Sequence, residues 1–478
     1  MSTVSTKEGQ LRKQLADVLN QEHHAGCQPW RPVFHLSPSV GLLNDPNGFI
    51  HYQGRYHLFY QWNPFACGHG PKFWGHVSSE NLCDWQEHSV ALVPSEDYES
   101  HGCYSGSAIE REGALLLFYT GNVKFSDGGR TAWQCVAEVT DDEVLKKGPV
   151  LGLPKGYTGH VRDPKVWQHS DGCWYMVLAA QDRQMQGKVL LYRSRDAFDW
   201  HLVGEMAGSQ TGSLGDFGYM WECPDLFLLG GKDFLLVCPQ GLEPEGDKYQ
   251  NLFQCGYFSG QLDYQSGTYS HGEFTELDAG FDFYAPQTTE DASGRRLIYG
   301  WLGLPDENES SHPTIEHGWI HCMSIPRELI ADGNRLKQRP ARELMNLRQE
   351  LVIDSLTSET FTVPEACELL INSVKAPFAL HFREAAELAW DGEFISLSRL
   401  NWRTGQWEHR RHACKSVNDI RLFHDSSTLE IFINDGSIVM SSRFFPEKNH
   451  QVCKYLSDIP GYLQVWSMRP SWLFQERG

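Results

Sequence analysis

The sequence predicts an all-β protein, a five-bladed β-propeller followed by a β-sandwich, with a short N-terminal helix. From about residue 34 to 340, short runs rich in Val, Ile, Phe, Tyr and Trp alternate with Gly, Pro, Asn and Asp, a pattern typical of many strands. Beyond residue 353 strand patterns resume without a period. In the first region five short apolar runs each begin with a glycine, at Gly54, Gly113, Gly172, Gly231 and Gly294. Each of the first three steps from one glycine to the next is 59 positions.

The repeat length favours a propeller. A unit of 59 residues is long enough for a four-stranded blade with its loops, and five units fit the span. The alternative is a β-helix, whose repeats are much shorter. Each glycine run then forms the second strand of a blade after a hairpin turn, and the residues just before that hairpin line the central channel at one end.

The flanking segments complete the domain plan. One apolar helical face is expected near the amino terminus, built from Leu11, Leu15, Val18 and Leu19. The turn Asn434-Asp435-Gly436 between two apolar runs predicts a hairpin of the sandwich. We expect the second domain to brace the propeller or to mediate self-association. The expected divisions are a helical segment over 1–30, the propeller over 31–340, a linker over 341–352 and the sandwich over 353–478.

Composition excludes several classes of partner. The formal charge of −20 disfavours nucleic acid and anionic membranes. No apolar run approaches the eighteen residues of a membrane helix, and Met1 to Gln10 is polar, without the pattern of a secretory leader. The thirteen cysteines cannot all pair and include no Cys-x-x-Cys motif. We therefore expect a cytoplasmic protein with buried thiols, acting on a small molecule.

Three acidic residues share one phase of the repeat. Asp45, Asp163 and Glu222 each lie nine positions before a repeat glycine. An acid beside a proline can simply cap a turn. A structural role, however, predicts the same residue in all five units, and units two and five carry Tyr104-Ser105 and Tyr284-Ala285 instead. Equivalent positions around an axis bring three carboxyl groups into one pocket, which suits cleavage of a glycosidic bond.

The neighbours of these acids suggest different roles. Retaining hydrolysis needs one carboxylate to attack the anomeric carbon and one carboxylic acid to protonate the leaving oxygen. Asp45, in a polar loop, is expected to stay ionised, whereas Glu222, beside Trp221, is expected to hold its proton. Asp163 follows Arg162, which should keep it ionised as a stabiliser of the transition state.

The motifs around these acids, with their order and spacing, resemble glycoside hydrolase family 32, the invertases and fructan hydrolases. Within the family the chain looks most like bacterial sucrose-6-phosphate hydrolases. One departure is Leu42-Leu43, where many members have a Trp-Met pair. The further matching stretches are His35–Pro38, Tyr104–Ser107, Tyr119–Phe125, Gly159–Lys165, Phe283–Thr288 and Leu429–Asp435.

The resemblance implies Asp45 as nucleophile, Glu222 as acid/base and Asp163 as stabiliser. It also implies a fructose pocket containing Asn44, Gln61, Trp74, Ser105, Arg162 and Trp301. From the residues alone, Trp74 and Trp301 could equally be packing residues. The expected reaction is cleavage of sucrose 6-phosphate through a covalent fructosyl-enzyme. The alternatives are an enzyme acting on unphosphorylated sugar and a sugar-binding propeller without turnover, which the complete acidic trio disfavours.

A phosphate group requires a basic pocket in this acidic chain. Arg130 is the first choice because a guanidinium matches phosphate oxygens in a fork. Solvated loop charge is the alternative for any single residue. No histidine has the spacing of a metal site, so neither metal nor cofactor is expected. The basic residues of the loops expected to rim the active face are Lys72, Lys124, Arg130, Arg183, Lys188 and Lys248.

Overall fold

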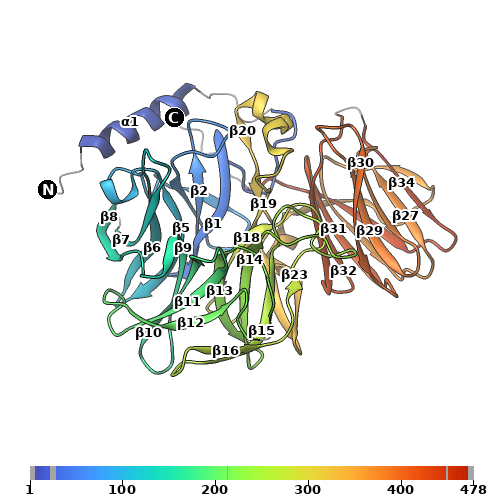
Figure 1. Ribbon diagram of the computed structural model, residues 1–478. Coiled ribbons are helices and arrows are strands. Elements are labelled where there is room, and N and C mark those ends of the chain that lie inside the picture. Colours follow the sequence, from blue (N-terminus) through green and yellow to red (C-terminus); the bar gives the residue numbers. More distant parts are fainter. Residues whose placement is uncertain (1–5, 22–27, 141–142, 213, 448–449, 472–478) are drawn as a thin grey trace.

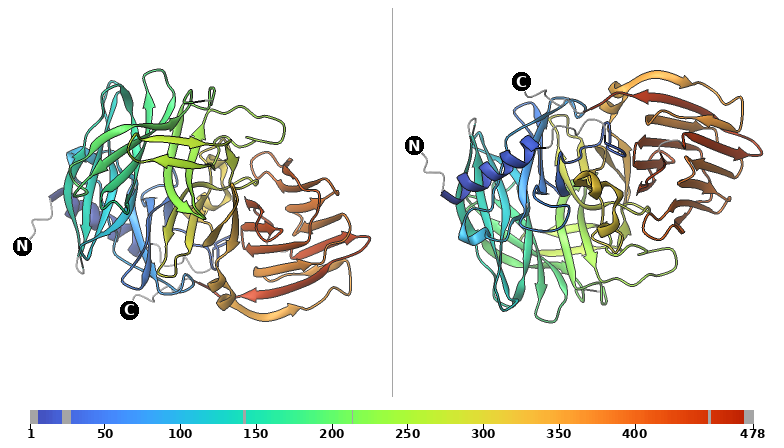
Figure 2. Two further views of the ribbon diagram at one scale, coloured as in Figure 1. Left: turned by 90° about the horizontal axis from the view of Figure 1, so that it is seen from below. Right: turned by 90° about the horizontal axis from the view of Figure 1, so that it is seen from above.

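The structure, a computed structural model, describes residues 6–21, 28–140, 143–212, 214–447 and 450–471 (Figure 1). The propeller occupies the blue-to-yellow part of the molecule and the sandwich the orange-to-red part. The two turned views show the domains side by side (Figure 2). Within the described residues, no helix has the length and apolar character needed to span a membrane.

Five sheets in the described residues form the blades, one for each sequence unit. Blade 1 contains β1 (Gly41–Tyr52), β2 (Arg55–Asn63), β3 (Phe73–Ser79), β4 (Trp85–Glu87) and β20 (Trp319–Ile320). Blade 2 contains β5 (Cys103–Arg111), β6 (Ala114–Lys124), β7 (Arg130–Val139) and β8 (Val144–Leu151). Blade 3 contains β9 (Tyr157–Gln168), β10 (Trp174–Asp182), β11 (Gly187–Ser194) and β12 (His201–Gly208).

Blade 4 contains β13 (Met220–Leu229), β14 (Lys232–Gln240), β15 (Gly256–Asp263), β16 (Thr268–His271) and β17 (Thr275–Glu276). Blade 5 contains β18 (Tyr284–Glu290), β19 (Arg296–Leu302), β21 (Cys322–Met323), β22 (Arg327–Asp332) and β23 (Arg335–Pro340). The ring closes where β20, which follows β19 in the last unit, pairs in parallel with β1 of the first.

The repeat glycines occupy the hairpin between the first two strands of every blade. All five have a left-handed backbone, with φ between 77° at Gly294 and 83° at Gly113. A residue without a Cβ adopts this conformation at little cost. The regular spacing of the glycines therefore reflects the hairpin turn of each blade. The prediction that each apolar run is a second strand is confirmed.

The helix α1 (Thr6–Gln21) lies against blade 1, as the apolar face predicted. Leu15 is buried in the core that blades 1, 4 and 5 share. The Arg12 guanidinium donates a hydrogen bond to the Val90 carbonyl oxygen at 2.9 Å. The burial of Leu15 and the hydrogen bond from Arg12 to the Val90 carbonyl oxygen hold the helix on the propeller.

The second domain packs two six-stranded sheets face to face. The first contains β24 (Arg348–Ile353), β35 (Tyr462–Met468), β26 (Ala366–Asn372), β31 (Asp419–Asp425), β32 (Thr428–Ile433) and β33 (Ile438–Arg443). The second contains β25 (Thr360–Thr362), β34 (Val452–Ser457), β27 (Phe378–Phe382), β28 (Ala386–Trp390), β29 (Phe394–Leu400) and β30 (Trp407–Ala413).

The segment expected to link the domains is shorter than predicted. A 3₁₀ turn, η5 (Arg342–Leu347), follows the propeller, and β24 then pairs with β35 at the edge of the sandwich. The pairing satisfies backbone groups that an exposed strand edge leaves open. The last five residues of the expected linker, 348–352, therefore belong to the second domain's first sheet.

Buried charges join the two domains. Arg327 of β22, fully buried, donates to Glu430 of β32 and to Asp278 between blades 4 and 5. His35 lies with its two ring nitrogens 2.8 Å from an Asp425 oxygen and 2.9 Å from a Glu430 oxygen. Two carboxylate contacts require both nitrogens to carry protons, so His35 is an imidazolium. These pairs fix the sandwich against the propeller.

Candidate active site

A bulge interrupts the first strand of every blade at the same place. Pairing with the second strand skips between Leu43 and Pro46 in blade 1, and each other blade has a matching shift, at Tyr104/Gly106, Arg162/Lys165, Glu222/Asp225 and Tyr284/Gln287. An extra residue in one strand re-aims the side chains around it. The three acids lie at these bulges, so the repeat directs them to the same end of the ring.

Asp45 is held by Asn44, its neighbour on β1, and by Ser105 of β5 in blade 2. The Ser105 hydroxyl donates to Oδ2, and the Asn44 amide donates to Oδ1 at 3.0 Å. Gln61 orders both donors, since its oxygen accepts from Asn44 and its amide donates to Ser105. Three of the residues expected in the fructose pocket thus surround Asp45.

A continuous set of contacts links the other two acids to Asp45. The Cys223 sulfur lies 3.9 Å from an Asp45 oxygen and 3.7 Å from an Asp163 oxygen. The Cys223 backbone N–H donates to Asp163 at 3.0 Å. The Arg162 guanidinium lies 4.0 Å from Asp163 and 2.6 Å from Glu222. Residues separated by up to 177 positions therefore share one pocket.

Glu222 has more partners than the sequence revealed. Nε and Nη2 of Arg162 both donate to one carboxylate oxygen, at 3.0 Å and 2.6 Å. The Tyr284 hydroxyl and the Gln240 amide donate to the other oxygen, both at 2.7 Å. The pair Tyr284-Ala285 stands in unit five at the position that the acids occupy in units one, three and four. Gln240 ends a second strand, β14, and nothing in the spacing of the motifs marked it.

In the unliganded site the pKa shifts of the three acids run against the expected roles. Burial alone would raise the pKa of Glu222, but the charge and hydrogen bonds of Arg162 outweigh it and lower that pKa. Burial, with the charge of Glu222, raises the pKa of Asp45 against the hydrogen bonds from Ser105 and Asn44. Burial also raises the pKa of Asp163 to about 7, although Arg162 opposes the shift. The reason is geometric: Arg162 forks onto Glu222 rather than onto Asp163.

The two tryptophans expected in the pocket are buried within its wall. Trp74 donates its indole N–H to the Tyr104 carbonyl oxygen at 3.2 Å. Trp301 packs edge-on against His321 and Tyr284, and its indole nitrogen has no partner among the described residues. The Asn44 side-chain oxygen is likewise buried without a partner there. Unpaired buried polar atoms beside a pocket are groups that a sugar hydroxyl can satisfy.

A basic cluster lies next to Glu222. Arg130 donates to the His160 Nδ1 at 3.0 Å and to the Asn122 side-chain oxygen at 2.7 Å. Arg162 donates to the same His160 nitrogen at 3.2 Å. Burial and the two guanidinium charges lower the pKa of His160 to about 4, so its ring is neutral. Arg130 and Arg162 thus share one histidine beside Glu222.

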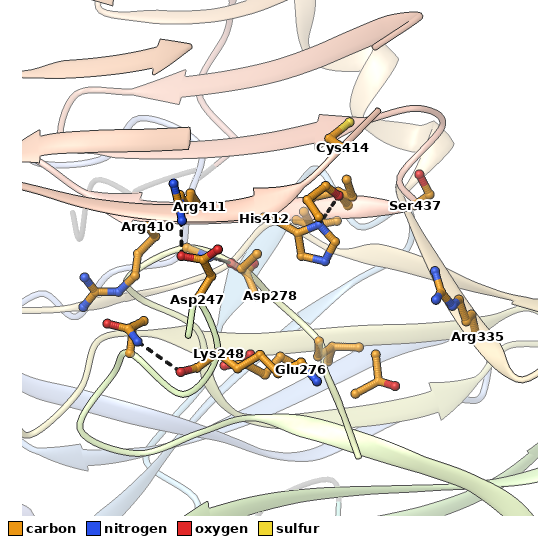
Figure 3. Close-up of a pocket in the computed structure, with 18 of the residues that line it drawn as sticks. Asp247, Lys248, Glu276, Asp278, Arg335, Arg410, Arg411, His412, Cys414 and Ser437 are labelled. Atoms are coloured by element: carbon orange, nitrogen blue, oxygen red, sulfur yellow. Dashed lines mark hydrogen bonds and ion pairs between the residues drawn. The ribbon is translucent and has the colours of Figure 1, made fainter. Parts of the chain in front are cut away.

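Other basic residues expected on the rim lie elsewhere. Lys188 is buried and donates to the Ser209 carbonyl oxygen at 2.7 Å. Lys72 is also buried. Lys248 lines a separate cavity of about 650 Å³ between blades 4 and 5 and the sandwich. Figure 3 shows this cavity, with Arg411 of β30 paired to Asp247 across it at 2.6 Å. It contains none of the three acids, so it is distinct from the candidate active site.

Within the described residues, no group of three or more His, Cys, Asp and Glu side chains is arranged to hold a metal ion. Every cysteine in the described ranges is a free thiol. The pocket itself contains three carboxyl groups, the Arg162 guanidinium, the Cys223 thiol and several hydrogen-bond donors.

Known families and proteins resemble this chain over most of its length. The "Glycosyl hydrolases family 32 N-terminal domain" matches residues 35–340, and the "Glycosyl hydrolases family 32 C terminal" domain matches 375–461. The sucrose-6-phosphate hydrolase of Bacillus subtilis is 46% identical over 92% of this chain and 94% of its own. That of Klebsiella pneumoniae is 49% identical over 95% and 97%.

Solved structures also resemble this chain over most of its length. The GH32 beta-fructofuranosidase of Bombyx mori superposes with a TM-score of 0.87 at 34% identity, covering 97% of this chain and 99% of its own. The sucrose-6-phosphate hydrolase of Lactobacillus gasseri superposes with a TM-score of 0.84 at 30% identity, covering 96% and 99%.

Proposed function

The chain belongs to glycoside hydrolase family 32, and from this premise we propose that it cleaves sucrose 6-phosphate to glucose 6-phosphate and fructose with retention of configuration. The observation that carries the proposal is the contact chain from Asp45 through Cys223, Asp163 and Arg162 to Glu222. Two carboxyl groups in one pocket supply both the nucleophile and the acid that this reaction needs.

Asp45 attacks the anomeric carbon of the fructosyl unit. The carbon–oxygen bond to the glucose unit breaks as Glu222 gives its proton to the departing oxygen, and an ester forms between Asp45 and the fructosyl carbon. Glu222 then takes a proton from water, which attacks the anomeric carbon, breaks the bond from that carbon to the Asp45 oxygen and releases fructose and the Asp45 carboxylate. Ser105 and Asn44 hold the two Asp45 oxygens throughout.

Arg162 decides when Glu222 can act as an acid. In the free site its fork favours the ionised form of Glu222. Fructosyl hydroxyl groups that accept hydrogen bonds from Arg162 weaken this fork and raise the pKa of Glu222, so the proton is present when the substrate is. Asp163 accepts hydrogen bonds from the same hydroxyls and offsets the positive charge that develops on the ring.

Replacement of the two central acids tests the reaction. Asp45→Asn and Glu222→Gln each keep the shape of the side chain, and we expect kcat to fall by about 10³-fold or more, as for other residues that take part in bond making. Folding, measured by circular dichroism and thermal unfolding, should be preserved. Either variant retaining the wild-type kcat would refute the assigned roles.

Arg130 and the adjacent His160 are the proposed contacts for the phosphate on the leaving glucose unit. Phosphate binding by a guanidinium typically contributes about 1.5–3 kcal/mol per charged hydrogen bond. Arg130→Gln should therefore lower kcat/KM for sucrose 6-phosphate by about 10-fold or more and leave kcat/KM for sucrose within about twofold. Arg111→Gln, a change at the outer end of β5 in the same blade, is the matched control.

Comparing kcat/KM for the two sugars also distinguishes the proposed function from its nearest alternative. An invertase or fructan hydrolase would show equal kcat/KM for the phosphorylated and free sugars in the wild type. The reduced thiols fit a cytoplasmic location, and the buried charges between the domains fit a bracing role for the sandwich. Self-association stays a prediction, which sedimentation equilibrium tests.

A further inference from the structure

His160 joins two arginines of the candidate active site through a single nitrogen atom. Nη1 of Arg130 lies 3.0 Å from Nδ1 of His160, and Nη1 of Arg162 lies 3.2 Å from the same atom. A guanidinium has only donors, so Nδ1 must accept both hydrogen bonds and the ring proton must lie on Nε2. This agrees with the pKa of about 4 to which burial and the two charges lower His160. One lone pair is therefore shared between two cations.

Arg130 is placed to bind an anion, because no carboxylate in the described part of the chain pairs with it. Its partners are neutral groups, the His160 ring, the Asn122 side-chain oxygen at 2.7 Å and the Tyr104 side chain. Its Nε is buried, with no partner among the described residues. Gly159 leaves room for the side chain, since a Cβ at residue 159 would lie 2.4 Å from Cγ of Arg130. A guanidinium held in this way has donors left for phosphate oxygens.

The second arginine holds the proposed acid. Arg162 donates from Nε and Nη2 to one oxygen of Glu222, at 3.0 Å and 2.6 Å, and Nη1 remains for His160. Asp45 of β1 and Asp163 of β9 favour the protonated form of Glu222, because like charges repel. Arg162 is the one described cation that pairs with Glu222, so its fork keeps that acid ionised. The neutral titratable groups around Glu222 are His160, Tyr219, Cys223 and Tyr284.

On the premise of the proposed function, we propose that His160 is a positioning residue that couples the phosphate of the substrate to Glu222, through the nitrogen that Arg130 and Arg162 share. A phosphate that binds Arg130 draws this guanidinium away from Nδ1. The lone pair is then free for Arg162, which moves toward the ring and loosens its fork on Glu222. Glu222 holds its proton more readily as a result. The phosphate therefore speeds bond cleavage as well as binding.

The test compares the first-turnover release of glucose from sucrose with that of glucose 6-phosphate from sucrose 6-phosphate. Both are measured by rapid quench at saturating sugar over a range of pH. The first turnover is chosen because the fructosyl-enzyme that follows is the same for both sugars. In the wild type, the loss of rate at high pH should occur about one unit higher with the phosphorylated sugar, the order of shift expected when an ionic partner of a carboxyl group is weakened.

Substitutions of the histidine separate the shared nitrogen from other effects. His160→Leu removes the acceptor, and the high-pH limbs of the two sugars should then coincide. His160→Asn places a side-chain oxygen close to the position of Nδ1 and should keep the limbs apart. His201→Leu, at the exposed start of β12 in the same blade, is the matched control and should behave as the wild type. Circular dichroism checks folding, and His160→Met provides the same comparison if the Leu variant does not fold.

Three results would overturn the role of His160. Limbs that stay apart in His160→Leu would show that the phosphate acts on Glu222 without the shared nitrogen. Limbs that coincide in His160→Asn would show that any change at this position has the same effect. Limbs that coincide in the wild type, while kcat/KM still favours sucrose 6-phosphate, would refute the coupling alone. Equal kcat/KM for the two sugars would instead refute the proposed substrate, on which the coupling rests.

Discussion

At the scale of single residues, Glu222 is governed by its hydrogen-bond donors. Arg162, Tyr284 and Gln240 together supply four donor groups to its two oxygens. Each of these bonds stabilises the ionised form more than the protonated one. In its proposed role as catalytic acid, Glu222 becomes competent only when one of these donors is drawn elsewhere, and we propose Arg162 as the donor that the sugar engages.

The pH dependence of turnover tests this arrangement. The kcat/KM profile reports the free enzyme and the kcat profile reports the complex. Because bound sugar draws Arg162 away from Glu222, the loss of activity at high pH should occur at higher pH in kcat than in kcat/KM. Arg162→Lys cannot form the fork, so the two limbs should lie closer together. Limbs at the same pH in the wild-type enzyme would contradict the role of Arg162.

His35 gives a second pH dependence, this one of stability. Burial alone would lower the pKa of His35, but its bonds to Asp425 and Glu430 outweigh burial and raise it. A raised pKa means that the folded state binds the proton more tightly than the unfolded state. The stabilisation by His35 is therefore present in full below its unfolded pKa and is lost as pH rises through the folded pKa.

The comparison variant is His35→Asn. The difference in the free energy of unfolding between wild type and variant should be larger at about pH 5.5 than at about pH 9, measured by urea titration. A difference that is the same at both pH values would show that His35 stabilises the fold by packing rather than by its charge.

At the scale of elements, hairpin turns set both the repeat and the domain contact. Gly54 and Gly436 have nearly the same backbone, with φ of 78° and 77°. A Cβ at Gly54 would meet nothing within 4 Å, whereas one at Gly436 would lie 1.8 Å from the Gln338 carbonyl oxygen of β23. The turn after β32 therefore docks on the propeller only because residue 436 has no side chain.

These two glycines form a matched pair of substitutions. Gly54→Ala should lower the free energy of unfolding by about 1 kcal/mol, the cost of a left-handed alanine. Gly436→Ala adds a steric clash and should lower it by about 3 kcal/mol or more. Equal losses in urea unfolding would show that the contact with Gln338 relaxes without cost.

At the scale of the whole molecule, one buried arginine holds the two domains together. Arg327 contacts Glu430 and Ser441 of the sandwich and Asp278 and Gln338 on the propeller side. A buried carboxylate that loses its cation is strongly destabilising, whereas an exposed pair contributes little. The interface contains both a buried and an exposed ion pair, because the exposed Arg339 pairs with Asp435 at 2.6 Å.

Arg327→Met should lower the free energy of unfolding by about 3–5 kcal/mol, because it leaves Asp278 buried without its cation and Glu430 with His35 alone. Arg339→Met, in the next strand of the same blade, should lower it by less than about 1 kcal/mol. Calorimetry should also show the two domains unfolding in separate steps in the first variant. Similar small effects for both variants would mean that apolar packing, rather than Arg327, joins the domains.

Much of the fold and part of the site could be predicted because they depend on neighbours along the chain. Hairpin glycines, strand-forming runs and the Asn434-Asp435-Gly436 turn depend on the backbone preferences of a few consecutive residues. The common phase of the three acids follows from the same local pattern. The extra strand β24 was missed because Arg348 to Ile353 pairs with an edge supplied from residues 462–468, which no local pattern indicates.

The sequence by itself determined the five units, their hairpins and the end of the ring at which the carboxyl groups gather. Only the tertiary structure decided that Arg162 forks onto Glu222 and that Gln240 and Tyr284 complete its contacts. Backbone preferences act within a turn or a strand, whereas the energy of a charge depends on its distance to other charges and on its burial. Both quantities are set by segments that lie far apart in the chain.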